Sequence, residues 1–402
     1  MRRRDRPLVF LASPLRLART LVVAAQAVLA ATVAAAPCGD VNGDGVVNVG
    51  DALVVAQFDV GISPCSRLTH LEACDVNGDG ACNIGDALRI AQCDVALMSC
   101  AFTCGPFTCP STTTTTLPGT CTGACRIRTV FLILMENHNW SSIKDSPSAP
   151  YINRRLLPIA SHAEQYYNPP NLHPSLPNYL WLEAGTNFGI LSSDDPSTAH
   201  QSTSRHLVDL LEAAGLSWRA YQEDISGTDC PLTEVGSYKV SHDPFVYFDD
   251  VTQGNNPRAA RCIEHVRPYS QLPTDLVNDT VARYNFITPD VCHDMHDVCA
   301  PLNDPVLQGD TWLSTEVPRI FASQAYANNG ALFIGWDEGK PGDGPIGMIA
   351  LSPKARGGGY QNTFHYTHSS TLRTIEEIFG VTPLLGDAGN ATDLRDLFVS
   401  FP

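Results

Sequence analysis

The chain has 402 residues, of which 44% are hydrophobic and 17% charged, and its formal net charge is −16. This length exceeds one small domain and allows a large core plus an accessory module, and the composition is ordinary for a globular protein. The net negative charge argues against a nucleic-acid binder, because an acidic surface repels a polyanion. It permits a small anionic substrate, because a bound metal ion can reverse the local electric field.

The N-terminus has the features of an export signal. The basic start MRRRDRPLVF is followed by the apolar run LVVAAQAVLAATVAAA, which ends in Ala-x-Ala spacing at Ala36. We therefore expect a signal peptide over residues 1–36 and a secreted or cell-surface protein, with a membrane anchor as the alternative interpretation. Ten of the 14 cysteines lie between Cys38 and Cys125, and in an exported chain they are expected to form disulfides.

An internal repeat follows. DVNGDGVVNVGDALVVAQ begins at Asp40 and DVNGDGACNIGDALRIAQ begins 35 residues later, at Asp75. In both copies, oxygen-bearing side chains occupy positions 1, 3, 5, 9 and 12 of a loop, and a glycine occupies position 6, where the loop turns sharply. This spacing predicts two Ca²⁺ loops, each leading into an apolar helix. The predicted ligands are Asp40, Asn42, Asp44, Asn48, Asp51, Asp75, Asn77, Asp79, Asn83 and Asp86.

These repeats resemble dockerin modules, which places a small all-α Ca²⁺-loop module at residues 37–103. The resemblance implies Ca²⁺ as the bound ion and a cohesin domain as a partner, and a Ca²⁺-stiffened spacer is the alternative. Residues 104–126 are rich in Thr, Pro and Cys and cannot build a core, so they are predicted to be a linker.

Residues 127–402 alternate between apolar runs and helical periods. Strands are predicted at RTVFLILME, LSWRAYQED, NFITPD, ALFIGWDEG and IGMIALSP, and helices at YINRRLLPIASHA, SLPNYLWLEAG, SRHLVDLLEAAG, TDLVNDTVARYN, EVPRIFASQAYANNG and SSTLRTIEEIFG. Repeated alternation of helix and strand favours an α/β fold with a mainly parallel sheet sandwiched by helices. Active sites of such sheets collect at the carboxyl ends of the strands.

Three of the predicted strands run directly into metal-binding residue types. These polar residues are Glu136 and Asn137 after the first strand, Asp290, His293, Asp294, His296 and Asp297 after the third, and Asp337 and Glu338 after the fourth. Their oxygens suit a hard divalent cation, which can hold a serine oxygen as the alkoxide. Ser175 stands at a predicted helix start, where free N–H groups attract an anion. Together these features predict attack on a phosphate, although a capping role alone would also explain Ser175.

The motifs LILMENHNW, HPSLPNYLWLEAG, SWRAYQED, FITPDVCHDMHD, WDEG and HYTHSSTLRTIEEIFG resemble the phosphoesterase family of secreted acid phosphatases and bacterial phospholipases C, over residues 126–397. The resemblance implies an alkaline phosphatase-like fold and a metal-dependent phosphomonoesterase with a phosphoserine intermediate, acting on phosphoinositides or other phosphate esters. It implies catalytic roles for Ser175, Asp294, His296 and His368, and metal binding by Glu136, Asn137, Ser175, Asp297, Asp337 and Glu338.

Two other functions remain open at this stage. One is a phospholipase C-type phosphodiesterase, and the other is a non-catalytic, cohesin-binding surface protein. His173 is expected either to contact phosphate or to support its loop. A disulfide between Cys292 and Cys299 is preferred over metal binding by their thiols, which leaves Cys230 and Cys262 as the other candidate pair. Neither a nucleic-acid partner nor stable membrane insertion is expected.

Overall fold

The computed structural model describes residues 37–59, 68–78, 82–107 and 126–402, in two compact units that divide between Thr114 and Thr115. The predicted signal peptide, Asp79 of the second loop and most of the predicted linker lie outside the described residues. Among the helices that are described, none combines the length and apolarity needed to cross a bilayer.

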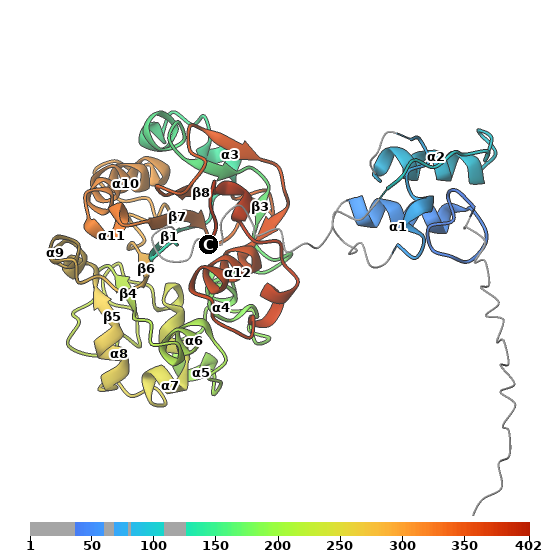
Figure 1. The fold of residues 1–402 in the computed structure, drawn as a ribbon. Helices are drawn as coiled ribbons and strands as arrows, with labels where there is room; N and C mark the ends of the chain where they lie inside the picture. The colour runs from blue at the N-terminus through green and yellow to red at the C-terminus, as the bar shows by residue number, and fades with distance from the viewer. Residues whose placement is uncertain (1–36, 60–67, 79–81, 108–125) are drawn as a thin grey trace, which may run out of the picture. The chain divides into compact units, whose positions relative to one another are not determined.

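The first unit contains helices α1 (Val49–Asp59) and α2 (Ile84–Asp94) and the 3-10 turn η2 (Leu71–Ala73) (Figure 1). Each of the two long helices begins within the last residues of a predicted Ca²⁺ loop, so the final loop residues form its first turn. Asn83 caps α2, and its side chain accepts the N–H of Gly85 at 2.7 Å. Disulfides join Cys38 to Cys104, Cys74 to Cys82 and Cys93 to Cys100.

The second unit is built on an eight-stranded sheet with strand order β5-β4-β6-β1-β7-β8-β2-β9. The strands are β1 (Thr129–Met135), β2 (Ser161–Ala163), β4 (Trp218–Gln222), β5 (Val266–Pro268), β6 (Tyr284–Thr288), β7 (Gly330–Trp336), β8 (Met348–Leu351) and β9 (Tyr360–Asn362). In this sheet only β8 runs antiparallel to its neighbours. The strands β3 (Tyr166–Tyr167) and β10 (Tyr366–Thr367) form a separate parallel pair. The predicted α/β class with a mainly parallel sheet is confirmed.

Helices lie on both sides of this sheet, with α9, α10 and α11 on one side and α4, α6 and α12 on the other (Figure 1). The helices are α3 (Trp140–Ile143), α4 (Ser175–Ala184), α5 (Pro196–Ala199), α6 (Leu207–Ala213), α7 (Asp249–Thr252), α8 (Ala260–His265), α9 (Leu272–Asn278), α10 (Pro305–Phe321), α11 (Gln324–Ala327) and α12 (His368–Phe379). Short turns are the π-helical η3 (Ile152–Leu156) and the 3-10 turns η4 (Val240–His242), η5 (Pro244–Tyr247), η6 (Tyr269–Gln271), η7 (Gly386–Gly389) and η8 (Arg395–Leu397).

Three predicted helices differ from the structure. The helix predicted at TDLVNDTVARYN, residues 274–285, ends at Asn278 in α9, and its last two residues belong to β6. The segment YINRRLLPIASHA forms only the short turn η3, and its last residues pair as β2 with β8 and β9. The segment EVPRIFASQAYANNG is divided at Ser323, whose hydroxyl accepts the N–H of Tyr326 and so starts α11. The first part extends α10, which begins upstream at Pro305. In these three segments local polar contacts and sheet pairing override the helical period.

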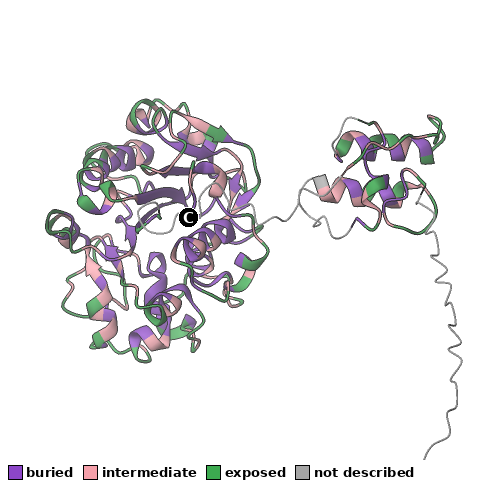
Figure 2. Cartoon of the chain, viewed as in Figure 1, coloured by how far each residue is buried: buried purple, intermediate pink, exposed green. Residues whose placement is uncertain are grey.

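The centre of the sheet positions the residues at the strand ends. Every residue of β1 and β7 is buried, as expected for central parallel strands covered on both faces (Figure 2). The order β6-β1-β7 places three parallel strands side by side. Their carboxyl ends therefore meet at one edge, where Glu136 follows β1 and Asp337 follows β7.

Candidate active site

Glu136 lies at the centre of the site. Its side chain is fully buried just beyond β1, and both of its carboxylate oxygens accept hydrogen bonds. Oε2 accepts the Ser175 hydroxyl at 2.9 Å and the Asn137 amide at 2.6 Å, whereas Oε1 accepts the Tyr179 hydroxyl at 2.5 Å. This carboxylate therefore joins the end of β1 to the start of α4.

Ser175 is the first residue of α4, but its hydroxyl does not cap the helix. The N-cap position is Pro174, where no side-chain cap bond forms, and the Ser175 hydroxyl donates to Glu136 instead. Its residue exposure is only 6%. The hydroxyl is thus held among carboxylates beside the N-terminal turn of a helix, where the free N–H groups favour an anion.

Asp337 comes from the neighbouring strand end. Its Oδ1 accepts the backbone N–H of Asn137 at 2.9 Å, and its own N–H donates to the Met135 carbonyl at 3.0 Å. Asn137 has a φ of +48°, a left-handed conformation that asparagine tolerates better than most residues and that directs this N–H toward Asp337. The second oxygen, Asp337 Oδ2, is buried and has no hydrogen-bond partner among the described residues.

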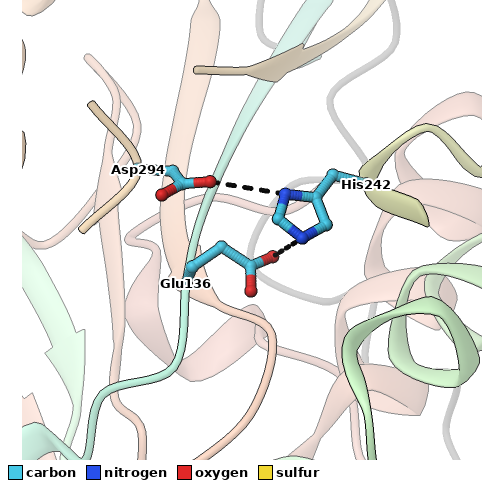
Figure 3. Close-up of side chains that lie close together, drawn as sticks. All are labelled: Glu136, His242 and Asp294. Atoms are coloured by element: carbon cyan, nitrogen blue, oxygen red, sulfur yellow. Dashed lines mark ion pairs between the residues drawn. The ribbon is translucent and has the colours of Figure 1, made fainter. Parts of the chain in front are cut away.

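Asp294 and His242 complete a tight group with Glu136. One ligand-type atom from each of the three residues lies within 4.8 Å of the others, and all three side chains are buried. Figure 3 shows the His242 ring between the two carboxylates, with Nε2 at 3.5 Å from Glu136 and Nδ1 at 3.3 Å from Asp294. The ring of Tyr179 stacks on His242 at 5.2 Å between centroids.

The electrostatics of this group favour a bound cation. Burial raises the pKa of Glu136 well above its usual value, and the nearby Asp337 and Asp294 raise it further. Burial also raises the pKa of Asp294 and of Asp337. Burial lowers the pKa of His242 to about 3, so its imidazole is neutral, which is the form that binds a metal. Carboxylates, a neutral imidazole and the unpartnered Asp337 Oδ2 therefore fit a divalent metal ion.

Glu338 lies at the rim of the site and is held by two donors. Its Oε2 is 2.8 Å from His173 Nδ1 and accepts the Asn178 amide at 3.1 Å, and burial raises its pKa to about 7. The other ring nitrogen of His173 is 2.6 Å from Asp343. His173 therefore bridges two residues of the loop after β7, and its contact with phosphate stays a prediction.

Three other predicted residues occupy different surroundings. His296 lies near the group, with its ring centroid 6.1 Å from that of His242, and its Nδ1 is 2.7 Å from Asp297. Asp297 is half exposed and lies outside the Glu136, His242 and Asp294 group. His368 is fully buried, with Nδ1 at 3.1 Å from the Tyr166 hydroxyl and Nε2 bonded to the Asp337 carbonyl. Burial lowers the pKa of His368 to about 4, so its ring is neutral at neutral pH, and its contact with the Asp337 carbonyl places the remaining ring proton on Nε2.

The loop after β6 divides its residues between two groups. Asp294 and His296 face the buried site, whereas Asp290 and His293 form a separate group with Glu223, whose Oε2 lies 2.9 Å from His293 Nδ1. Disulfides join Cys292 to Cys299 and Cys230 to Cys262, so both predicted pairings are present. The first of these closes the loop that presents Asp294.

Sequence reasoning missed His242 and Tyr179. His242 ends a 3-10 turn and follows no strand, so the strand-end argument could not reach it. Tyr179 stands four residues after Ser175 on α4, and that spacing alone places both on one helix face. The helical spacing in α4 therefore could have predicted that Tyr179 lies beside Ser175, whereas no pattern in the sequence around His242 indicated that it belongs to the site.

Buried polar side chains gathered at the carboxyl edge of a mainly parallel α/β sheet are typical of the active site of an α/β enzyme. The particular family follows from the sequence comparisons. Residues 163–382, more than half of the chain, match the Phosphoesterase family, and the chain belongs to this family. Residues 38–93 match the Dockerin type I domain. The resemblances drawn from the motifs are confirmed, and the protein is a hydrolase of phosphoric esters.

Curated relatives are similar over the second unit. The phosphatidylinositol-3-phosphatase of Mycobacterium tuberculosis is 28% identical over 67% of this chain and 82% of its own length. The phosphate-repressible acid phosphatase of Penicillium chrysogenum is 26% identical over 53% of this chain, and the match spans 51% of that relative. A solved alkaline phosphatase superfamily protein from Vibrio parahaemolyticus covers 68% of this chain and 72% of its own, at 10% identity and a TM-score of 0.46. The fold class rests on the strand order of the sheet.

Proposed function

We propose that the second unit is a metal-dependent phosphomonoesterase of the acid phosphatase type, with Ser175 as its nucleophile. The observation that carries this proposal is the 2.9 Å contact between the Ser175 hydroxyl and Glu136, inside a buried carboxylate group with an unpartnered oxygen on Asp337. The relatives named as acid phosphatases and as a phosphatidylinositol-3-phosphatase support the substrate class, including phosphoinositide head groups.

The residues that would hold the metal are Glu136, Asn137, Ser175, Asp337 and Glu338, together with Asp294 and His242. When bound, a divalent cation lowers the pKa of the serine hydroxyl and neutralises charge on the phosphoryl oxygens. Asp297 is proposed to hold His296, which it contacts at 2.7 Å, and not to bind the metal.

The reaction divides into two displacements at phosphorus. The Ser175 oxygen forms a P–O bond while the bond from phosphorus to the ester oxygen breaks, and the alcohol leaves with a proton. Water then displaces the serine oxygen and releases inorganic phosphate. The N-terminal N–H groups of α4 are available to the phosphoryl oxygens in both steps.

His296 is proposed to donate the proton to the leaving alcohol. It is partly exposed, and its contact with Asp297 orients the ring. His368 is proposed to position Asp337, because one of its nitrogens bonds to the Asp337 carbonyl and the other lies 3.1 Å from the Tyr166 hydroxyl. This assignment replaces the acid role that the motif resemblance implied for His368.

The experiment that tests the activity compares a phosphomonoester and a phosphodiester, both with aryl leaving groups, over a panel of divalent metals. Hydrolysis of the monoester at least about tenfold faster than the diester supports the proposal. Faster diester cleavage would favour a phospholipase C-type enzyme. Absence of both activities in the folded, metal-supplied protein would favour a binding protein with an inert catalytic fold.

We further propose that the first unit binds two Ca²⁺ ions and docks a secreted or surface protein to a cohesin domain. The dockerin match supports the ion, the partner and an extracellular location. A duplicated apolar surface also supports docking, since Val49 and Leu53 on α1 correspond by the 35-residue repeat to Ile84 and Leu88 on α2. All four side chains are more than half exposed. Calorimetry with calcium, and then with a cohesin, tests both claims.

A further inference from the structure

A basic pocket lies at the amino-terminal edge of the sheet, whereas Ser175 lies at the carboxyl-terminal edge. Arg128 immediately precedes β1, and Arg283 immediately precedes the parallel strand β6, so both enter the sheet from this edge. With Arg126 they line a cavity of about 260 Å³, whose apolar wall includes Leu216 and Phe379. We call these three residues and their cavity the three-arginine pocket.

The pocket concentrates positive charge in a chain whose net charge is −16. Arg283 is partly buried, and its Nε is a buried donor without a hydrogen-bond partner among the described residues. Burial lowers the pKa of Arg283, and repulsion from Arg128 and Arg126 lowers it further, so the three guanidinium groups act on one another.

Arg126 also contacts the end of a helix. Arg126 Nη2 donates to the carbonyl of Ile378, near the C-terminus of α12, at 2.9 Å. A helix C-terminus carries about half of a negative charge, which is less than the charge of the Arg126 guanidinium that contacts it. Arg126 therefore keeps a net positive charge beside the unpartnered Nε of Arg283, and guanidinium groups bind tetrahedral oxyanions through paired N–H donors.

We propose that the three-arginine pocket binds a multivalent oxyanion, such as phosphate or the phosphate group of a small ester, at a site separate from Ser175. The site does not depend on the proposed catalytic mechanism, because none of its residues contacts the Glu136 group. Its ligand is recognised by charge and oxygen geometry, and the apolar wall can accommodate a small organic substituent.

The experiment titrates inorganic phosphate into the full chain by calorimetry at low ionic strength. It compares the parent, the variant Arg126→Gln/Arg283→Gln and the control Arg154→Gln/Arg155→Gln, which removes two equally charged, exposed side chains of η3. Parent and control should each bind one more phosphate than the pocket variant, and sulfate should compete for that extra site. All three proteins should hydrolyse an aryl phosphate at equal rates.

Equal phosphate stoichiometry in the three proteins would overturn the proposal. If the double variant loses its native circular dichroism, phosphate binding is measured instead on the single variant Arg126→Gln. The Arg126 side chain is exposed, so its replacement leaves the core intact. Losing one charge-assisted contact should raise the Kd for phosphate at the pocket about tenfold. An unchanged Kd in that variant would equally overturn the site.

Discussion

The two units of this protein are stabilised by different means. In the first, the fully buried apolar residues are few, among them Val41, Val55 and Ile90, and three disulfides cross-link the described residues. In the second, a continuous core surrounds the sheet, and the described residues include two disulfides, one of which joins the buried Cys230 and Cys262. A small unit buries too little surface to fold on apolar contacts alone and depends on cross-links and ions, whereas the large unit does not.

Acidic residues also serve different purposes in the two units. In the first loop, Asp51 Oδ1 accepts the N–H of Val41 at 2.8 Å, and Asp40 accepts the N–H of Gly43 at 2.9 Å. In the active site, carboxylates gather around Glu136, and one oxygen of Asp337 has no partner within the described residues. Backbone donors therefore stabilise the loop carboxylates, whereas burial and repulsion from the nearby carboxylates raise the pKa of Glu136.

The largest effect is expected from Ser175→Ala, which removes the proposed nucleophile from the second unit. Turnover of an aryl phosphate should fall by roughly 10⁴-fold, because a covalent step is lost and other groups supply only residual catalysis. Steady-state rates on purified protein provide the measurement, with the exposed Ser193→Ala as the matched control. Similar rates in Ser175→Ala and the control would remove Ser175 from the mechanism.

A large effect on stability is expected from His206→Gln. His206 is fully buried beside Glu183, at 3.0 Å, and Asp250, at 3.1 Å. Burial lowers the pKa of His206, but these carboxylates and Asp209 raise it more, so that its net pKa lies well above 6.5. Removing one partner of a buried charge group should lower the free energy of unfolding by about 3 kcal/mol at pH 6.

The sign of the pH dependence follows from that raised pKa. The folded protein retains the His206 proton at pH values where the unfolded chain loses it, so this stabilisation is complete below about pH 6.5. It is then lost as the pH rises through the folded pKa. Urea unfolding of parent and His206→Gln at several pH values should show the difference shrinking toward alkaline pH. A difference that grows with pH would contradict the charged state assigned to His206.

A smaller effect on catalysis is expected from His173→Gln. His173 bridges Glu338 and Asp343, so its loss should loosen Glu338 and weaken metal binding about tenfold, with a smaller change in kcat at saturating metal. Metal titration of activity measures both quantities. Asp343→Asn should weaken metal binding by a similar factor. The double variant His173→Gln/Asp343→Asn should bind the metal only slightly more weakly than either single variant. Full additivity of the two losses would show that the residues act independently.

The smallest effect on catalysis is expected from removing calcium. The two predicted Ca²⁺ loops belong to the first unit, and none of the residues around Ser175 does. In the full chain, Asp40→Asn combined with Asp75→Asn should abolish the calcium heat in calorimetry yet change kcat/KM less than about twofold. A substantial loss of activity would show that the first unit supports catalysis.

The local patterns in the sequence identified several parts of the site. The apolar runs of β1 and β7 and the polar residues after them placed Glu136 and Asp337 at one edge of a parallel sheet, because residues at the ends of neighbouring strands must meet. The repeat at Asp40 and Asp75 likewise indicated the first unit, because Ca²⁺ loop spacing is local in sequence.

Only the tertiary structure decided which histidines lie in the site. His242 comes from a 3-10 turn and reaches Glu136 and Asp294 across three chain segments, so no spacing predicts it. Conversely, the motif that suggested His368 as an acid cannot reveal that its ring is fully buried, with one nitrogen bonded to the Asp337 carbonyl. Burial and partners depend on packing between distant segments, and these determine the protonation state and hence the chemical role of each side chain.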